Sequence, residues 1–172
     1  MRKISFLLIT ALTLSLGEVI FAQDQLTTVA VDDNGITINS VVVNLPAEDS
    51  LITKLLGKPD RTDNKKVNVI LTWDKLGITG YKAKNSNKIN TLDIVFKPGE
   101  FDFSPRRVFK GEITFYSHIL SGNTKKQDLQ KSNFIVDPED DTWWDAEAGY
   151  LYLIAVLSED YSGLSDVEIG VK

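Results

Sequence analysis

The side chains with the greatest capacity for chemistry are gathered in residues 137–147, which read DPEDDTWWDAE. Three carboxylates at alternate positions, Asp137, Glu139 and Asp141, are the hard oxygen ligands that calcium prefers. An EF-hand loop beginning at Asp137 would also need glycine at its sixth position and glutamate at its twelfth, where Thr142 and Ala148 stand. We therefore interpret the segment as a solvated acidic loop and expect neither a metal site nor another cofactor.

Aromatic side chains accompany these carboxylates. Trp143, Trp144, Tyr150 and Tyr152 offer large rigid surfaces that could stack on a sugar or anchor a protein partner. We expect at least two of them to fill the core. Because neighbouring residues of a strand point to opposite faces, one of Trp143 and Trp144 should be partly exposed. The predicted partner-binding residues are Trp143, Trp144, Asp140, Asp141, Asp145 and Tyr150.

The supply of catalytic groups is small. The chain has one histidine, His118, and no cysteine, so a Cys–His pair is excluded and a serine triad would rest on that histidine alone. No Gly-x-Ser-x-Gly elbow, Gly-rich phosphate loop or zinc ligand pattern is present. The sequence therefore predicts a protein that is not an enzyme, although paired carboxylates in the acidic loop leave a glycosidase as an open alternative.

Length and composition indicate one or two small globular domains. The 172 residues are 42% hydrophobic and carry a net charge of -5. An acidic chain binds polyanions poorly, so no nucleic-acid partner is expected. Without cysteine there can be no disulfide, and stability must come from packing.

The first residues resemble a targeting segment. Arg2 and Lys3 precede an apolar run over 4–16, and Ala22 offers a cleavage point before Gln23. These features predict a signal peptide over residues 1–22 and export to the periplasm or the extracellular space. The apolar run is shorter than the roughly 20 residues of a membrane-spanning helix, so the mature chain is expected to have no stable membrane span.

Hydrophobic periodicity predicts the elements of the first half. A hairpin is expected over 26–38 around Asp-Asp-Asn-Gly, with a further strand over 41–45. Leu51, Ile52, Leu55 and Leu56 form one stripe of a short helix that Gly57 should end. Strands beginning at 67, 78 and 89 predict an antiparallel meander, in which Trp73 packs in the core and the residues Asp74 to Gly77 form a turn.

The second half shows a similar order beyond a Pro-Gly seam at 97–100. Strands are expected over 109–116, 118–120, 134–136, 150–157 and 167–171, with a helix ending near Lys131. The Trp73-Asp74 pair and the Trp144-Asp145 pair are interpreted as matching corners of a duplication. The predicted fold is therefore α+β, with mainly antiparallel strands in two tandem sheet-plus-helix repeats with curled sheets, at 23–97 and 98–172, which could also form one continuous domain.

The segments Leu55-Leu56-Gly57-Lys58-Pro59-Asp60-Arg61 and 71–78 (LTWDKLGI), with the strand over 89–96, resemble an uncharacterised family of often exported bacterial domains. The resemblance covers about residues 36–96 and implies a sheet-plus-helix fold without an established reaction. In outline the chain is also similar to the tandem-repeat β-lactamase inhibitor proteins, whose curved sheet grips a partner enzyme. Their cysteines are absent here, so their target is not carried over.

Three functions are consistent with these observations. The sequence favours a non-catalytic exported module that binds another protein, with an inhibitor or an immunity factor as the kinds considered. A carbohydrate-binding or weakly hydrolytic domain that uses the loop 137–147 is the main alternative. An envelope scaffold without a soluble ligand is the third.

Overall fold

The computed structural model describes residues 26–172, so the predicted signal peptide at 1–22 lies outside the described part of the chain. The described residues form two β-sheets, which share one core, and two short helices. The hairpin predicted around Asp-Asp-Asn-Gly is confirmed, because residues 29–32 pair antiparallel with 35–38.

The smaller sheet has five strands drawn from both halves of the chain. These strands are β1 (Val29–Asp32), β2 (Gly35–Ile38), β3 (Val41–Val43), β9 (Ile113–Phe115) and β10 (His118–Leu120). Their order is β10-β9-β1-β2-β3. Only the β1–β9 pair in this sheet is parallel, and it joins the N-terminal hairpin to a strand more than 80 positions later.

The larger sheet has nine strands. They are β4 (Ala47–Glu48), β5 (Arg61–Asn64), β6 (Asn68–Trp73), β7 (Ile78–Ala83), β8 (Lys88–Val95), β11 (Ile135–Val136), β12 (Trp143–Ala148), β13 (Leu151–Leu157) and β14 (Leu164–Val171). Two antiparallel meanders, β5–β8 and β11–β14, meet where β8 pairs with β14. The predicted meander over β6, β7 and β8 is confirmed.

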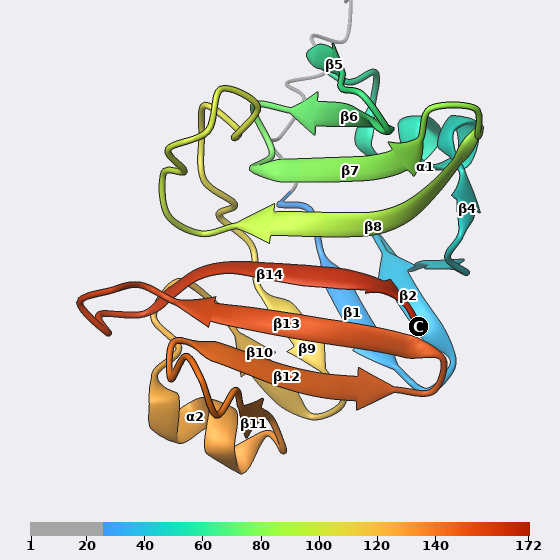
Figure 1. Ribbon diagram of the computed structural model, residues 1–172. Helices are drawn as coiled ribbons and strands as arrows, with labels where there is room; N and C mark the ends of the chain where they lie inside the picture. Colours follow the sequence, from blue (N-terminus) through green and yellow to red (C-terminus); the bar gives the residue numbers. More distant parts are fainter. Residues whose placement is uncertain (1–25) are drawn as a thin grey trace, which may run out of the picture.

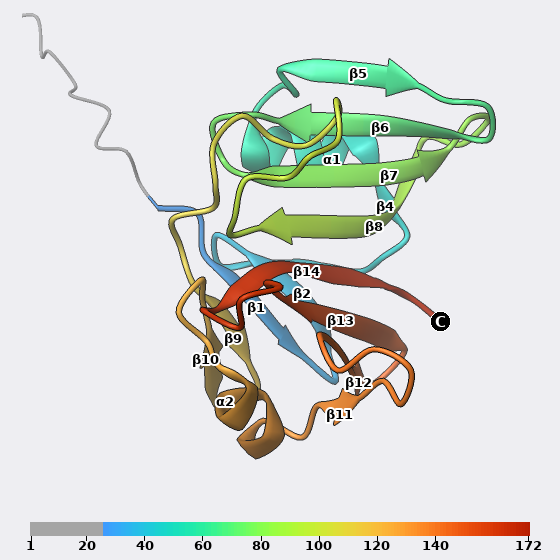
Figure 2. The same cartoon turned by 60° about the vertical axis from the view of Figure 1, so that its left-hand side comes forward.

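One face of the larger sheet is covered and the other is open. The smaller sheet and helix α1 (Asp49–Leu56) lie behind the larger sheet in Figure 1, and Figure 2 shows the strands of the smaller sheet crossing those of the larger one. The core between these layers includes Trp73 and Trp144, each at most 2% exposed, and Ile52 of α1. Alternation along each strand therefore sends every second side chain to the open face.

The helices are minor elements. Helix α1 buries Ile52 and ends before Gly57, as its apolar stripe predicts, and Gly57 has a positive φ of 84°. Helix α2 (Lys126–Lys131) is a single six-residue segment that buries Leu129.

The predicted fold class is wrong. Of the described residues, 45% are in strands and 10% in helices, so the fold is β-rich rather than α+β. Each sheet contains strands from both sides of the seam at 97–100, instead of two separate curled sheets with one helix each. Strand pairing is governed by backbone hydrogen bonds between distant segments, which local periodicity does not specify. The outline likeness to the tandem-repeat inhibitors depended on that repeat and loses its basis.

The two Trp-Asp pairs are not matching corners. Trp73 is the last residue of β6, and the turn that follows it is confirmed by the Gly77 N–H, which donates to the Trp73 carbonyl at 3.1 Å. Trp144 is the second residue of β12, whose corner comes at Gly149 and Tyr150. The two tryptophans share a buried position but lie at opposite ends of their strands.

Candidate functional site

Strand register gathers acidic and hydroxyl side chains at the centre of the open face. Asp93 of β8 pairs with Glu168 of β14, and Asp166 lies two positions from Glu168 on the same face. On the other side of β8, Thr79 of β7 is the direct partner of Asp93. Four polar side chains from three adjacent strands are therefore neighbours, at the point where the two meanders meet.

These side chains line a cleft of about 680 Å³. Its floor is formed by β7, β8, β13 and β14, and its rim includes Trp143 at the start of β12, the loop 97–104 and the β13–β14 turn. In Figure 1 this face is turned toward the viewer, with both loops at the left-hand end of the strands.

Two polar atoms in the cleft have no hydrogen-bond partner. Thr79 is 1% exposed and its Oγ1 is unpartnered, and Asp93 Oδ1 is inaccessible to solvent and also unpartnered. Buried polar atoms are nearly always hydrogen-bonded in folded proteins, so these two atoms are candidates to receive a hydrogen bond from a bound ligand. The two residues line the same cleft from paired strands.

Several acidic groups that line the cleft have raised pKa values. Burial raises the pKa of the Asp93 carboxyl well above its usual range, and the charges of Asp166 and Glu168 raise it further. Burial likewise raises the pKa of Asp166, although the residue reaches solvent in part. Burial, followed by the Asp93 charge, raises the pKa of the Tyr81 phenol. Perturbed acids gathered in a cleft are a common feature of functional sites.

Glu168 has one fixed partner. The Tyr152 hydroxyl donates to Glu168 Oε1 at 2.6 Å. The Tyr152 ring lies over Gly170, where an added Cβ would come within 2.4 Å of the ring. A glycine at this position thus allows Tyr152 to lie flat on β14 and to orient the Glu168 carboxylate.

Aromatic side chains form two walls of the cleft. Phe101 and Phe103 stack with ring centroids 5.2 Å apart and planes 2° from parallel. Across the floor, Trp143 is 44% exposed and also lines the cleft. The expected partial exposure of one residue of the Trp143–Trp144 pair is confirmed.

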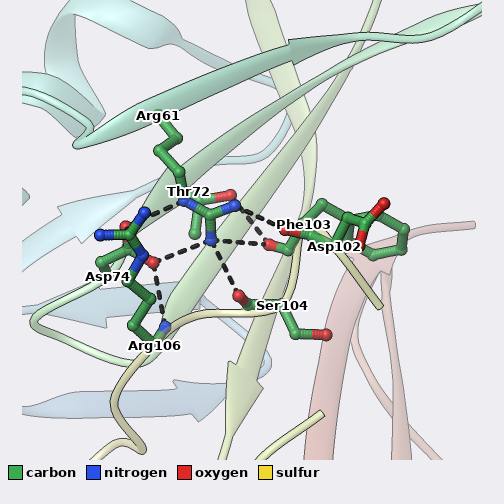
Figure 3. Close-up of polar contacts among 7 residues, drawn as sticks. All are labelled: Arg61, Thr72, Asp74, Asp102, Phe103, Ser104 and Arg106. Atoms are coloured by element: carbon green, nitrogen blue, oxygen red, sulfur yellow. Dashed lines mark hydrogen bonds and ion pairs between the residues drawn. The ribbon is translucent and has the colours of Figure 1, made fainter. Parts of the chain in front are cut away.

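An arginine–aspartate pair fixes the wall that carries Phe101 and Phe103 (Figure 3). The Arg61 guanidinium donates to both carboxylate oxygens of Asp74, at 2.9 and 2.8 Å. It also donates to the carbonyls of Asp102 at 2.6 Å and Ser104 at 2.8 Å. A planar guanidinium with five donors can hold a carboxylate and a loop backbone at once.

Two further hydrogen bonds join residues 72–74 to residues 103–106. Thr72 Oγ1 donates to the Phe103 carbonyl at 3.1 Å, and the Arg106 N–H donates to Asp74 Oδ1 at 2.9 Å. The hydrogen bond from Arg61 is the main reason why the pKa of Asp74 is lowered. Asp74, which the sequence assigned only to a turn, therefore also positions one wall of the cleft.

The predicted partner-binding residues are dispersed. Trp143 lines the cleft, whereas Trp144 is 2% exposed, donates from Nε1 to the Asp141 carbonyl at 3.0 Å and presents no surface to a partner. The assignment of Trp144 to the binding surface therefore needs correction. Its side chain points to the covered face because alternation places only Trp143 on the open one.

The carboxylates of Asp140 and Asp141 in the acidic loop already accept hydrogen bonds from the protein itself. Asp140 accepts hydrogen bonds from the Thr142 N–H and hydroxyl, at 2.9 and 2.6 Å. Asp141 accepts from the Tyr161 hydroxyl at 2.5 Å, and that bond and the neighbouring Lys126 lower the pKa of Asp141. Such contacts are typical of a structured turn rather than of an open ligand site.

The remaining two predicted residues also lie apart from the cleft. Asp145 is exposed on the open face, paired with Ile154 of β13. Tyr150 is 38% exposed in the β12–β13 turn, at the end of β12 opposite Trp143, where its hydroxyl is 3.4 Å from Asn44. The structure does not bring Tyr150 together with the other predicted residues.

Asp93, Asp166 and Glu168 line the cleft but were not among the residues predicted from the sequence. The sequence does contain a signal for them, because Leu92-Asp93-Ile94 and Val167-Glu168-Ile169 each place a carboxylate inside an apolar strand. A charge flanked on both sides by core residues marks the outer face of a strand that is buried on its inner face. Which strands lie side by side cannot be read from that pattern.

Two general properties of the described residues bear on possible ligands. Residues 26–172 contain no group of three or more His, Cys, Asp or Glu side chains arranged to hold a metal ion. Within the same range, neither helix has the length and apolar character needed to cross a membrane.

Solved structures resemble this fold at low sequence identity. An extracellular protein containing a SCP domain from Bacillus anthracis matches with a TM-score of 0.51 and 10% identity, over 73% of this chain and 43% of that one. This chain thus spans less than half the length of that protein, and the likeness concerns the fold alone.

Two weaker similarities carry no argument. A DUF4309 family protein from Bacillus subtilis has a TM-score of 0.45 and 14% identity, over 78% of this chain and 84% of that one. A cysteine-rich secretory protein from Staphylococcus aureus has a TM-score of 0.39 and 11% identity, over 73% of this chain and 44% of that one.

Sequence comparison gives the family without a function. No curated protein matches the chain significantly. The model of a domain family of unknown function, DUF7738, matches residues 28–130, which is more than half of the chain. The chain therefore belongs to the DUF7738 family.

Proposed function

We propose that this protein is a non-catalytic exported module that binds a partner protein through the cleft on the open face of its larger sheet. The observation that carries the proposal is the pair of unpartnered polar atoms, Thr79 Oγ1 and Asp93 Oδ1, in a cleft of about 680 Å³. A partner that supplied a donor there would pair groups that have no hydrogen-bond partner among the described residues.

The rim of the cleft has the composition of a protein-binding surface. Trp143 is 44% exposed and Phe101 is 69% exposed, on opposite walls. Rigid aromatic side chains beside desolvated polar groups are the usual anchors of protein interfaces. Export is proposed from the basic and apolar character of residues 1–22, and a partner would then be met in the periplasm or outside the cell.

A retention experiment tests this function. The mature protein, immobilised, is expected to retain a specific protein from the envelope or secreted fraction of its source bacterium, and Trp143→Ala should lose it. Tyr116→Ala is the matched control, because Tyr116 is an aromatic residue of similar exposure, 45%, next to the smaller sheet. Equal retention by the two variants, or no specific retention, would count against the cleft as the binding site.

A hydrolytic function is a second candidate that one observation favours. The raised pKa of Asp93 beside the carboxylate of Glu168 is the pattern of an acid and a base with different roles. Measurable cleavage of a polysaccharide by the wild type, lost in Glu168→Gln and kept in Asp145→Asn, would establish it. The absence of turnover across a broad panel of glycans would remove it.

A further inference from the structure

We infer that the cleft receives a cationic side chain of the partner protein, an arginine, which would lie among the carboxylates of Asp93, Asp166 and Glu168 and between the aromatic walls. This inference rests on the proposed function and specifies which group of the partner enters the cleft. It is carried by the charge of the lining, the unpartnered buried acceptors and the aromatic rim.

The lining is strongly acidic. It contains six carboxylates and one basic side chain, Lys97. The Lys97 ammonium is already engaged, since it donates to Asp160 Oδ1 at 3.2 Å and also to the Ser162 hydroxyl. The six carboxylates are Asp93, Glu100, Glu159, Asp160, Asp166 and Glu168. This excess favours a cation and disfavours an anionic ligand.

The unpartnered atoms need donors. Once a cation has displaced the proton of Asp93, the ionised carboxylate only accepts hydrogen bonds, so the unpartnered Oδ1 needs an N–H or O–H donor. Thr79 Oγ1, 1% exposed and directly across from Asp93, can accept a second donor from the same group. A guanidinium carries five N–H donors in one plane and could reach both acceptors.

The aromatic walls favour arginine over lysine or a metal ion. The exposed rings of Phe101 and Trp143 line the cleft beside the carboxylates, whereas the Phe103 ring is already stacked on Phe101 and lies under the Lys65 ammonium. A guanidinium stacks on aromatic faces and is more weakly hydrated than an ammonium, so it loses less on entering a partly apolar cleft. The carboxylates of residues 26–172 are not arranged in a metal-binding group.

Proton release should accompany binding. The titratable groups that interact with Asp93 are Tyr81 from β7 and Asp166 and Glu168 from β14. Lys97 and Glu100 from the loop line the same cleft. Burial and the acidic neighbours favour the protonated form of Asp93 in the free protein. A cation favours the ionised form, so its binding should displace the proton and should strengthen as pH rises.

The test uses short defined peptides and the mature protein. Acetyl-Gly-Gly-Arg-Gly-Gly-amide is titrated while the NMR signals of the Trp143 indole and the Thr79 amide are followed. Two comparison peptides carry citrulline or lysine in place of the arginine. Citrulline keeps the shape of the arginine side chain but removes its charge. We expect the arginine peptide to bind roughly tenfold more tightly than the citrulline peptide, because hydrogen bonds to charged groups are the stronger class.

Two variants locate the site. Glu168→Gln should weaken the arginine peptide roughly tenfold, whereas Asp145→Asn, which removes an exposed carboxylate on the same face but outside the cleft, should change its affinity by less than about twofold. Titration calorimetry in two buffers of different ionisation enthalpy should show proton release with the wild type. The amide spectrum of each variant verifies its fold.

The outcomes separate the two proposals. Equal affinity for the arginine peptide and either the citrulline or the lysine peptide would overturn the inference, and so would the absence of shifts with all three at their highest soluble concentration. In either case the proposed function stands if a partner is still retained in a Trp143-dependent way. If that retention alone is lost, the proposed function is overturned. The peptide titrations then still decide whether the cleft binds an arginine side chain.

Discussion

Asp93 is a residue whose surroundings in the cleft lower the stability of the fold. Its Oδ1 is buried without a partner, and acids in neighbouring positions oppose its ionisation. A carboxyl whose pKa is raised in the folded state binds a proton more tightly there than in the unfolded chain. Its contribution to stability is therefore greatest in acid and is lost as pH rises through the folded-state pKa.

The first prediction follows from the direction of this pH dependence of stability. Asp93→Asn should increase the free energy of unfolding at pH 8 by about 1 kcal/mol, because the wild type must there either keep a proton on Asp93 or bury its charge, whereas asparagine requires neither. The gain should shrink toward pH 4. Urea denaturation of both proteins at pH 4, 6 and 8 measures the difference. Asp145→Asn, exposed on the same sheet face, should change stability little at any of these values. A loss of stability in Asp93→Asn at pH 8 would contradict the prediction.

The Arg61–Asp74 pair has the opposite linkage. Because the hydrogen bond from Arg61 lowers the pKa of Asp74, the pair stabilises the fold above the unfolded-state pKa and loses that contribution as pH falls through the folded-state value. Asp74 is 7% exposed, so removing Arg61 would leave a nearly buried carboxylate without its main partner.

The second prediction is that Arg61→Ala lowers the free energy of unfolding at pH 7 by about 3 kcal/mol, as expected when one partner of a largely buried ion pair is removed. The difference from wild type should decrease below about pH 4, the range in which a carboxyl titrates. Arg106→Ala is the matched control, because the Arg106 side chain contacts the same carboxylate at 3.7 Å but is 78% exposed. Equal effects of the two substitutions would show that burial of the contact is not decisive.

At the scale of elements, the β6–β7 turn packs against the chain segment around Phe109. Gly77 has a φ of 73°, and a Cβ there would come within 2.1 Å of the Phe109 backbone nitrogen. The same nitrogen donates to the Val95 carbonyl at 2.7 Å, so the turn is packed against the segment that leaves the cleft loop. Backbone conformation and space both require glycine at this position.

The third prediction compares two glycines. Gly77→Ala should lower the free energy of unfolding by about 3 kcal/mol or more, whereas Gly57→Ala should lower it by about 1–2 kcal/mol, since both have positive φ but only Gly77 lacks space for a methyl group. Thermal and urea unfolding measure both. A Gly77→Ala variant as stable as Gly57→Ala would mean that the Phe109 segment can move aside.

The elements that could be predicted were those with a clear local period. Helix α1, the N-terminal hairpin and the strands β6, β7 and β8 were identified from apolar spacing and turn residues. Strand β12 was not, because its inward positions after Trp144 are Ala146 and Ala148, whose small side chains give no strand signal. Only packing against the smaller sheet makes them core residues.

At the scale of the whole molecule, the β8–β14 pair joins two meanders into one sheet and leaves one face uncovered. The floor of the cleft is polar at its centre because the carboxylates and hydroxyls of this face alternate with the apolar residues of the opposite face. Side chains on paired strands are held more rigidly than side chains on loops, which suits the binding role proposed for the cleft.

The fourth prediction concerns export. Expressed with residues 1–22 in a bacterial host, the protein should be recovered in the periplasm or the medium with an N-terminus near residue 23, as the charged and apolar character of 1–22 predicts. N-terminal sequencing or intact mass of the recovered protein measures this. Recovery of the uncleaved chain in the cytoplasm would contradict it. Arg2→Glu with Lys3→Glu should reduce export.

The sequence by itself determined the features that depend on neighbours along the chain: the turns at Gly35 and Gly77, the end of α1 at Gly57, and the opposite orientations of Trp143 and Trp144. Only the tertiary structure decided that β8 lies beside β14 and β1 beside β9. The reason is that strand partners are chosen by backbone hydrogen bonds and packing over long separations. Asp93 and Glu168, 75 positions apart, become neighbours in the cleft only through that choice.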